Sequence, residues 1–204
     1  SAAVAVTDNP SINAEINQQH EVVFLDLNDI KGFEREISKN VCAVIIESIQ
    51  GVGGLDEPTT EFLQKVAALC KENDALLIAD EVQSGFGRSG KFFGFQHHNI
   101  QPDIISIAKG MGNGFPVGGV LIHENIKAKY GMLGTTFGGN HLACVATLAV
   151  LDVIEGENLI ANAEELGIYF NEKAKEIPQV KRVKGKGLML GLEFDFQVAD
   201  LRKK

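Results

Sequence analysis

The stretch DIISIAKGMG at residues 103–112 combines a short β-branched run with a lysine and two glycines. The run Ile104–Ile107 is typical of a buried strand in a parallel sheet. Lys109 falls where this strand should end, and the glycines after it let the backbone bend sharply. Burying an ammonium costs free energy, so a desolvated lysine loses its proton more readily, which suits imine formation. A surface lysine in a loop is the alternative reading.

A second apolar run, ALLIADEVQ at residues 75–83, predicts another buried strand that ends in Asp80. In open α/β sheets, ligands bind outside the carboxyl ends of the strands. If the two strands are parallel neighbours, Asp80 and Lys109 face one crevice. That pair suits pyridoxal 5′-phosphate (PLP), because the lysine holds the aldehyde as an imine and the aspartate keeps the pyridine nitrogen protonated. Asp80 and Glu81 could instead cap a helix. The glycines near Lys109 match neither a P-loop nor a dinucleotide fingerprint.

Three ordered segments, residues 78–90, 102–119 and 134–140, resemble the signatures of the class III, fold-type I, PLP-dependent aminotransferases. The branch of acetylornithine and succinylornithine aminotransferases is the most similar. The resemblance implies an α/β fold whose large domain has a mainly parallel sheet. It places residues 1–156 in the PLP-binding domain and residues 157–204 at the start of a small C-terminal α/β domain.

The resemblance also implies a role for each matching cofactor residue. Lys109 would form the imine, and Asp80 would pair with the pyridine nitrogen. Val82 would pack on one ring face, and Gln83 would hydrogen-bond near the ring hydroxyl. Thr136 would reach the phosphate of the partner subunit's cofactor, which implies a homodimer.

Glu47 follows the apolar run 41–46 and lies in a segment, residues 46–54, that resembles the family's Glu-Pro-x-Gln-Gly-Glu-Gly-Gly motif near the substrate. The sequence departs from that motif twice. Ser48 replaces the usual proline. Val52 replaces the second glutamate, which in relatives pairs with a substrate-binding arginine, so the departure leaves the amino donor open.

By resemblance, the enzyme moves the terminal amino group of N2-acetylornithine or N2-succinylornithine to 2-oxoglutarate, a step of arginine biosynthesis. The alternatives are another class III enzyme, such as an ornithine or 4-aminobutyrate aminotransferase or an aminomutase, and an inactive fragment. Family members are roughly twice as long, in line with a two-domain enzyme. Because the chain begins at Ser1 without a methionine, we expect an internal piece of a longer enzyme.

Composition narrows the classes of partner. The 204 residues carry a formal net charge of −8 and no long basic run, which argues against nucleic acid and anionic membranes. No apolar run is long enough to span a bilayer. Three scattered cysteines without a CxxC motif predict buried, reduced thiols in a cytoplasmic protein. The adjacent pair His97 and His98 lacks the spacing of a metal site, so we expect no metal.

Apolar periodicity predicts further elements along the chain. We expect a short strand at residues 21–25, helices at 30–40 and 58–73, a strand at 117–122 of undecided direction, a largely buried helix at 141–155 that lies between subunits or in the core, a helix at 157–176 and a strand at 188–194. A glycine-rich loop at residues 131–140 could bind phosphate, but from the residues alone a plain loop is the expected reading.

Overall fold

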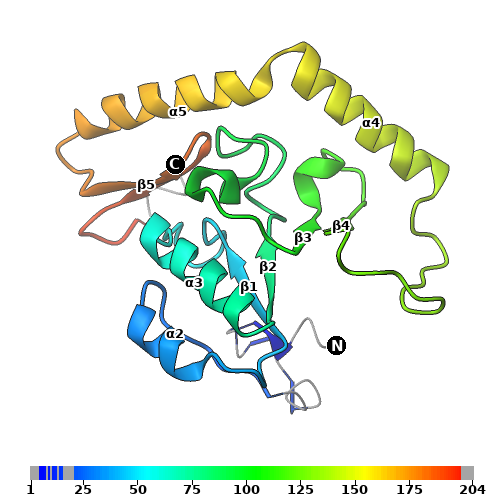
Figure 1. Cartoon of the computed structure of the whole chain (residues 1–204). Coiled ribbons are helices and arrows are strands. Elements are labelled where there is room, and N and C mark those ends of the chain that lie inside the picture. The colour runs from blue at the N-terminus through cyan, green and yellow to red at the C-terminus, as the bar shows by residue number, and fades with distance from the viewer. Residues whose placement is uncertain (1–4, 8, 10, 13, 16–20, 199–204) are drawn as a thin grey trace.

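The computed structural model describes residues 5–198 except 8, 10, 13 and 16–20. Its centre is a four-stranded sheet in the order β1-β2-β3-β4 (Figure 1). The strands are β1 (Ala43–Glu47), β2 (Leu76–Asp80), β3 (Ile104–Ile107) and β4 (Gly119–Ile122). The first three run parallel, as predicted, and β4 pairs antiparallel with β3. The fold is therefore a mixed α/β fold with a mostly parallel sheet.

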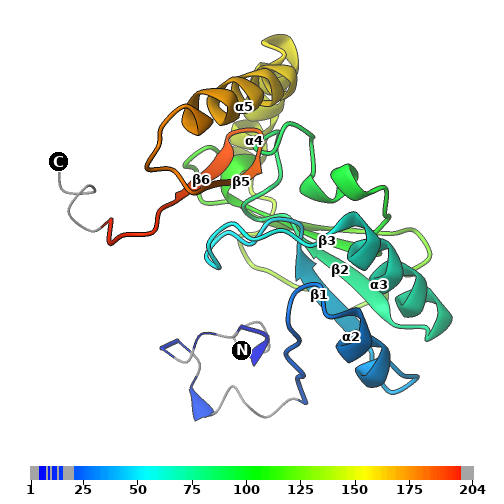
Figure 2. The ribbon, with the colours of Figure 1, turned by 90° about the vertical axis from the view of Figure 1, so that its left-hand side faces the viewer.

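Two helices, α2 (Ile30–Glu36) and α3 (Thr60–Glu72), pack beside β1 and β2 (Figure 2). The Thr59 side chain caps α3 by accepting a hydrogen bond from the backbone of Phe62, so the helix begins just after the expected proline. One apolar cluster joins these helices to the sheet. Its buried members are Phe33, Phe62, Val66, Cys70, Ala75 and Leu77.

The three cysteines differ in their surroundings. Cys70 is buried in the core cluster, and burial, together with the nearby charge of Asp103, raises the pKa of its thiol to about 11. Cys42 and Cys144 are exposed, so the expectation of three buried thiols is wrong for these two. Cys42 directly precedes β1, which is an edge strand of the sheet.

His98 belongs to the 3₁₀ helix η2 (Gly94–His98) and is buried against α3. Its Nδ1 lies 3.0 Å from Thr60 Oγ1, and its carbonyl oxygen accepts from Gln64 at 3.0 Å. Burial is the main cause that lowers the pKa of His98, followed by the charge of Lys186. The histidine therefore serves packing, and no cluster of three or more metal ligands occurs among the residues that the structure describes.

Helices α4 (His141–Gly156) and α5 (Leu159–Lys175) form a long arm across one end of the molecule (Figure 1). Asn140 caps α4 by accepting from the amide of Ala143. We expected α4 to be mostly buried, but within this chain Ala143 is the one buried residue of the helix. The helix is apolar on several faces, and Leu142, Val145, Leu148 and Val153 are exposed in this chain.

The described C-terminal part is a hairpin of β5 (Arg182–Lys186) and β6 (Met189–Glu193). The second strand was predicted, whereas the first, with the polar sequence RVKGK, was not. The strand predicted at residues 21–25 is wrong, since that segment forms no strand. No helix among the described residues is long and apolar enough to cross a membrane.

Candidate functional site

Two carboxylates lie at the carboxyl ends of neighbouring strands of the sheet. Glu47 is the last residue of β1 and Asp80 the last of β2, and the two residues are paired in register. Asp80 is paired in turn with Ser106 of β3. The parallel arrangement thus brings these polar residues to the edge where the sequence analysis expected a crevice.

Asp80 is held in place by two hydrogen bonds to the same oxygen. Its Oδ1 accepts from the backbone amide of Val82 at 3.1 Å and from Ser106 Oγ at 3.1 Å. Both bonds end on Oδ1, which leaves Oδ2 able to accept from a ligand. Ser106 was missed by the sequence analysis, although a lone hydroxyl within an isoleucine run was the available signal.

Lys109 opens a short 3₁₀ helix, η3 (Lys109–Met111), directly after the strand that carries Ser106. Its backbone has φ +46°, in the left-handed region that side chains other than glycine rarely adopt. The side chain is exposed, so the desolvation that the sequence predicted is absent. The reason is that β3 ends at Ile107, so Lys109 lies on the turn beyond the sheet.

A cavity of about 370 Å³ adjoins Lys109. Gln83, Phe86 and Arg88 line it on the side of β2, and the junction of α4 and α5 lines the other side. Asp80 and Glu47 do not line this cavity. The cavity therefore adjoins Lys109 but neither of the two carboxylates.

Glu47 is sensitive to the charges of both other candidates. Burial raises the pKa of its carboxyl, and the neighbouring Asp80 raises it further. The amide of Gly51, which donates to Glu47 Oε1 at 3.2 Å, and the charge of Lys109 act in the opposite direction. Glu47, Asp80 and Lys109 therefore share one electrostatic neighbourhood.

The loop after β1 interlocks with Gln83. A Cβ added at Gly51 would lie 1.8 Å from Gln83 Nε2, so only glycine fits at this position unless Gln83 moves. Val82, the residue before Gln83, is half-buried. Val52, which replaces the family glutamate, is 88% exposed and leaves this edge of the site without a carboxylate at that position.

Glu81 follows Asp80 and is fully buried. Its carboxylate accepts four hydrogen bonds, from Ser48 Oγ (3.1 Å), Ser84 Oγ (2.7 Å) and the amides of Gly94 (2.7 Å) and Phe95 (2.9 Å). It thus ties the loops after β1 and β2 to η2, a function that the sequence analysis missed.

The serine that departs from the family motif has a structural partner here. Ser48 is buried, and its hydroxyl donates to Glu81. A proline at this position could make no such bond. The substitution therefore adds a hydrogen bond beneath the candidate site instead of changing a residue that faces it.

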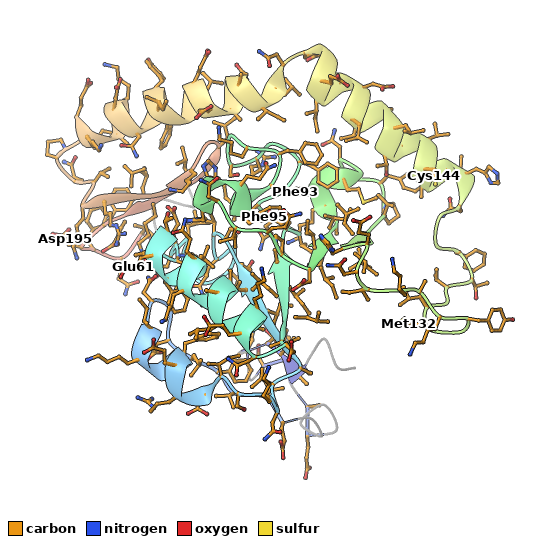
Figure 3. The ribbon with its side chains drawn as sticks, in the orientation of Figure 1. Glu61, Phe93, Phe95, Met132, Cys144 and Asp195 are labelled. Carbon is orange, nitrogen blue, oxygen red and sulfur yellow. The ribbon has the colours of Figure 1, made fainter. Side chains whose placement is uncertain are left out.

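Thr136 lies in an exposed glycine-rich loop that Figure 3 shows, around the labelled Met132, extending away from the sheet. The structure of one chain does not bring Thr136 to the carboxylates or to Lys109. Its expected contact with a cofactor would have to be made to another subunit.

Comparison with known proteins matches the chain to one family. The family model described as aminotransferase class-III matches residues 2–203. The acetylornithine aminotransferase of Aquifex aeolicus is 46% identical over 179 residues, which are 87% of this chain and 47% of that protein. The acetylornithine aminotransferase of Bacillus subtilis is 42% identical over 87% of this chain and 48% of its own length.

Solved structures agree with this match. The ornithine aminotransferase of Toxoplasma gondii has a TM-score of 0.86 at 29% identity, over 95% of this chain and 48% of that chain. Another structure of that enzyme is described as having partial occupancy of PLP at its active site. The chain spans about half the length of the curated relatives it matches. With the family model covering nearly every residue, the chain belongs to the class-III aminotransferases.

Proposed function

We propose that this chain carries the PLP-binding residues of an aminotransferase that acts on the terminal amine of N2-acetylornithine or N2-succinylornithine. The observation that carries the proposal is the placement of Glu47 and Asp80 at the carboxyl ends of two parallel strands, with Lys109 just beyond the end of the third. Residues 1–156 would belong to the PLP-binding domain, and residues 157–204 would begin the small domain.

The residues present fit the cofactor. Lys109 offers an exposed amine for the aldehyde, and Asp80 Oδ2 can accept from the protonated ring nitrogen, while Val82 and Ser106 hold Oδ1. Val82 and Gln83 would contact the ring. PLP, when bound, supplies an electron sink that stabilises negative charge at the donor's amino-bearing carbon.

The chain's own residues would handle protons and charge. As a base, Lys109 Nζ would take the proton from the amino-bearing carbon of the donor, and as an acid it would deliver that proton to the carbon of the former aldehyde. The carboxylate of Asp80 would keep the proton on the ring nitrogen. Glu47, whose carboxyl has a raised pKa, would contact the substrate beside Lys109.

The identity of the amino donor rests on the relatives. Acetylornithine aminotransferases are among the proteins at 42–46% identity, but a Staphylococcus aureus protein named ornithine aminotransferase 2 is also 42% identical. We favour an acylated donor because of the 46% identity to an acetylornithine aminotransferase, whereas Val52 in place of the glutamate favours neither donor. A panel of amino donors with 2-oxoglutarate separates these substrates, and an aminomutase would need no keto acid.

The first test is to incubate the protein with PLP, reduce with borohydride and map the adduct by peptide mass. We expect one phosphopyridoxyl group on Lys109, because it is the lysine that follows the strand paired with the Asp80 strand. The exposed Lys91 and Lys127 serve as internal controls. An adduct spread evenly over all three lysines would contradict the assignment of Lys109.

We also propose that the protein is a homodimer, which would bring Thr136 to the partner's cofactor. Support comes from large apolar side chains that this chain leaves exposed on α4 and on the loop before it. They are Met132, Leu133, Phe137, Leu142, Val145 and Leu148. Large apolar side chains exposed in such number along one helix and the loop before it favour a site of protein association.

The dimer predicts how Cys144 reacts. Cys144 and Leu148 are one helical turn apart and share a face of α4, so a partner that covers Leu148 would also shield Cys144. We expect iodoacetamide to label Cys42 quickly and Cys144 slowly, and Leu148→Glu to give a monomer with both labelled. A wild-type monomer whose Cys144 reacts as fast as Cys42 would exclude this interface.

A further inference from the structure

The β5–β6 hairpin lies against the loop that leaves β1 at the candidate site (Figure 2). Lys184 Nζ is 2.8 Å from Asp56 Oδ1, and Lys186 Nζ is 2.7 Å from Glu57 Oε2. The amide of Gly185 donates to Glu57 Oε1 at 3.0 Å. Three consecutive residues of one strand thus hold two consecutive acidic residues of the loop.

The ion pairs are better shielded than those on the open surface. The side chains of Lys184 and Asp56 are 18% and 45% exposed, and those of Lys186 and Glu57 are 35% and 24% exposed. Lys184 also approaches Glu193 Oε2 at 3.5 Å. Shielding from solvent strengthens charge interactions, so these pairs should fix the loop more firmly than exposed pairs would.

Backbone bonds carry this restraint toward the site. The amide of Gln50 donates to the carbonyl of Asp56 at 2.9 Å, and the amide of Leu55 donates to the carbonyl of Gln50 at 3.0 Å. Residues 50–56 therefore form one closed loop. Its Gly51 touches both Glu47 and Gln83.

The hairpin also contacts the loop that follows β2. The amide of Leu188 donates to the carbonyl of Arg88 at 2.9 Å. Gly187, with φ +54°, lies so close to Ser89 and Gly90 that a Cβ would approach their backbone within 2.4–2.6 Å. The hairpin therefore touches the loops that follow both strands of the carboxylate pair.

We propose that Lys184 and Lys186 are positioning residues, which act through Asp56 and Glu57 to hold loop 50–56 so that the Gly51 amide stays on Glu47. The inference rests on the proposed function for its catalytic meaning, since Glu47 is assigned to the substrate there. Its structural content does not depend on PLP. The C-terminal hairpin thereby fixes the position of Glu47 through loop 50–56, without itself contacting the reacting atoms.

The test measures amide hydrogen exchange in this chain without cofactor. In the double variant Lys184→Met, Lys186→Met, we expect the Gly51 and Leu55 amides to exchange roughly fivefold faster, because two shielded ion pairs no longer restrain local opening. The amide of Leu77 in β2 should exchange at an unchanged rate. The double arginine variant, Lys184→Arg with Lys186→Arg, should restore slow exchange.

Lys181→Met provides the matched control, since Lys181 contacts Glu193 of the same hairpin at 3.3 Å and not the loop. Exchange at Gly51 should stay unchanged in this variant. Unchanged Gly51 exchange in the double variant, or equal acceleration at Leu77, would overturn the proposal. The exchange measurement needs no PLP. The absence of a PLP adduct on Lys109 would therefore refute the proposed function, whereas the exchange rates alone decide whether Lys184 and Lys186 position the loop.

Discussion

Replacing Lys109 by alanine is expected to abolish the borohydride-fixed PLP adduct and to lower multiple-turnover transamination by at least about 10²–10⁴-fold, the usual contribution of a positioned acid–base group. Lys109 follows β3, the parallel neighbour of the strand that ends in Asp80. Alanine leaves the turn in place but removes both the amine that binds the aldehyde and the group that moves the proton. Mass mapping and steady-state rates with an acylated ornithine donor check the two effects.

The control for this prediction is Lys91→Ala, which removes another exposed lysine that follows the loop after β2. It should leave the adduct and the rate unchanged. Adding a small primary amine should partly restore activity to the Lys109→Ala protein, because the proton transfer then has a substitute base. A Lys109→Ala enzyme that turns over repeatedly at the wild-type rate without added amine would refute the role of Lys109.

Replacing Glu81 by alanine is expected to lower the free energy of unfolding by about 3–5 kcal/mol, a loss typical of a broken buried network. The carboxylate accepts hydrogen bonds from Ser48, Ser84, Gly94 and Phe95 in a fully buried position. With alanine at position 81, these four buried donors would have no acceptor in the protein or in solvent. Urea unfolding of the variant, followed by circular dichroism, measures the loss.

Two controls separate the network from the loss of a charge. Glu61→Ala removes an exposed acid in the first turn of α3, labelled in Figure 3, and should cost less than about 1 kcal/mol. Ser48→Ala removes one donor and should cost about 1 kcal/mol, the net value of one hydrogen bond. If Glu81→Ala unfolded at the same urea concentration as Glu61→Ala, the four hydrogen bonds would not stabilise the fold.

The strands that carry the site were predictable because buried parallel strands are nearly continuous apolar runs. Residues 75–83 and 103–112 contain such runs, and a polar residue at each end marked Asp80 and Lys109 without knowledge of the fold. Polarity hid β5, whose side chains form ion pairs with a loop more than a hundred residues earlier in the chain. The pattern of apolar and polar residues along a segment does not show which distant segment it will contact.

Burial was harder to predict than strand position. Glu81 reads as a surface acid, since its four donors come from three separate segments that only the fold brings together. The apolar sequence of α4 predicted burial, but within one chain most of its side chains face solvent. Hydrophobicity shows that a surface should be covered, and the sequence alone cannot say by which chain.

The left-handed backbone conformation of Lys109 lowers the stability of the fold at a residue that the proposed activity requires. For an L-residue this conformation costs roughly 1–2 kcal/mol, a cost that glycine does not incur. A sequence selected only to keep the chain folded would therefore favour glycine at position 109. The chain thus accepts a less favourable backbone conformation in order to place an amine just beyond the end of β3. Redesign of this loop for stability alone would replace Lys109 by glycine and so remove the amine on which the proposed activity depends.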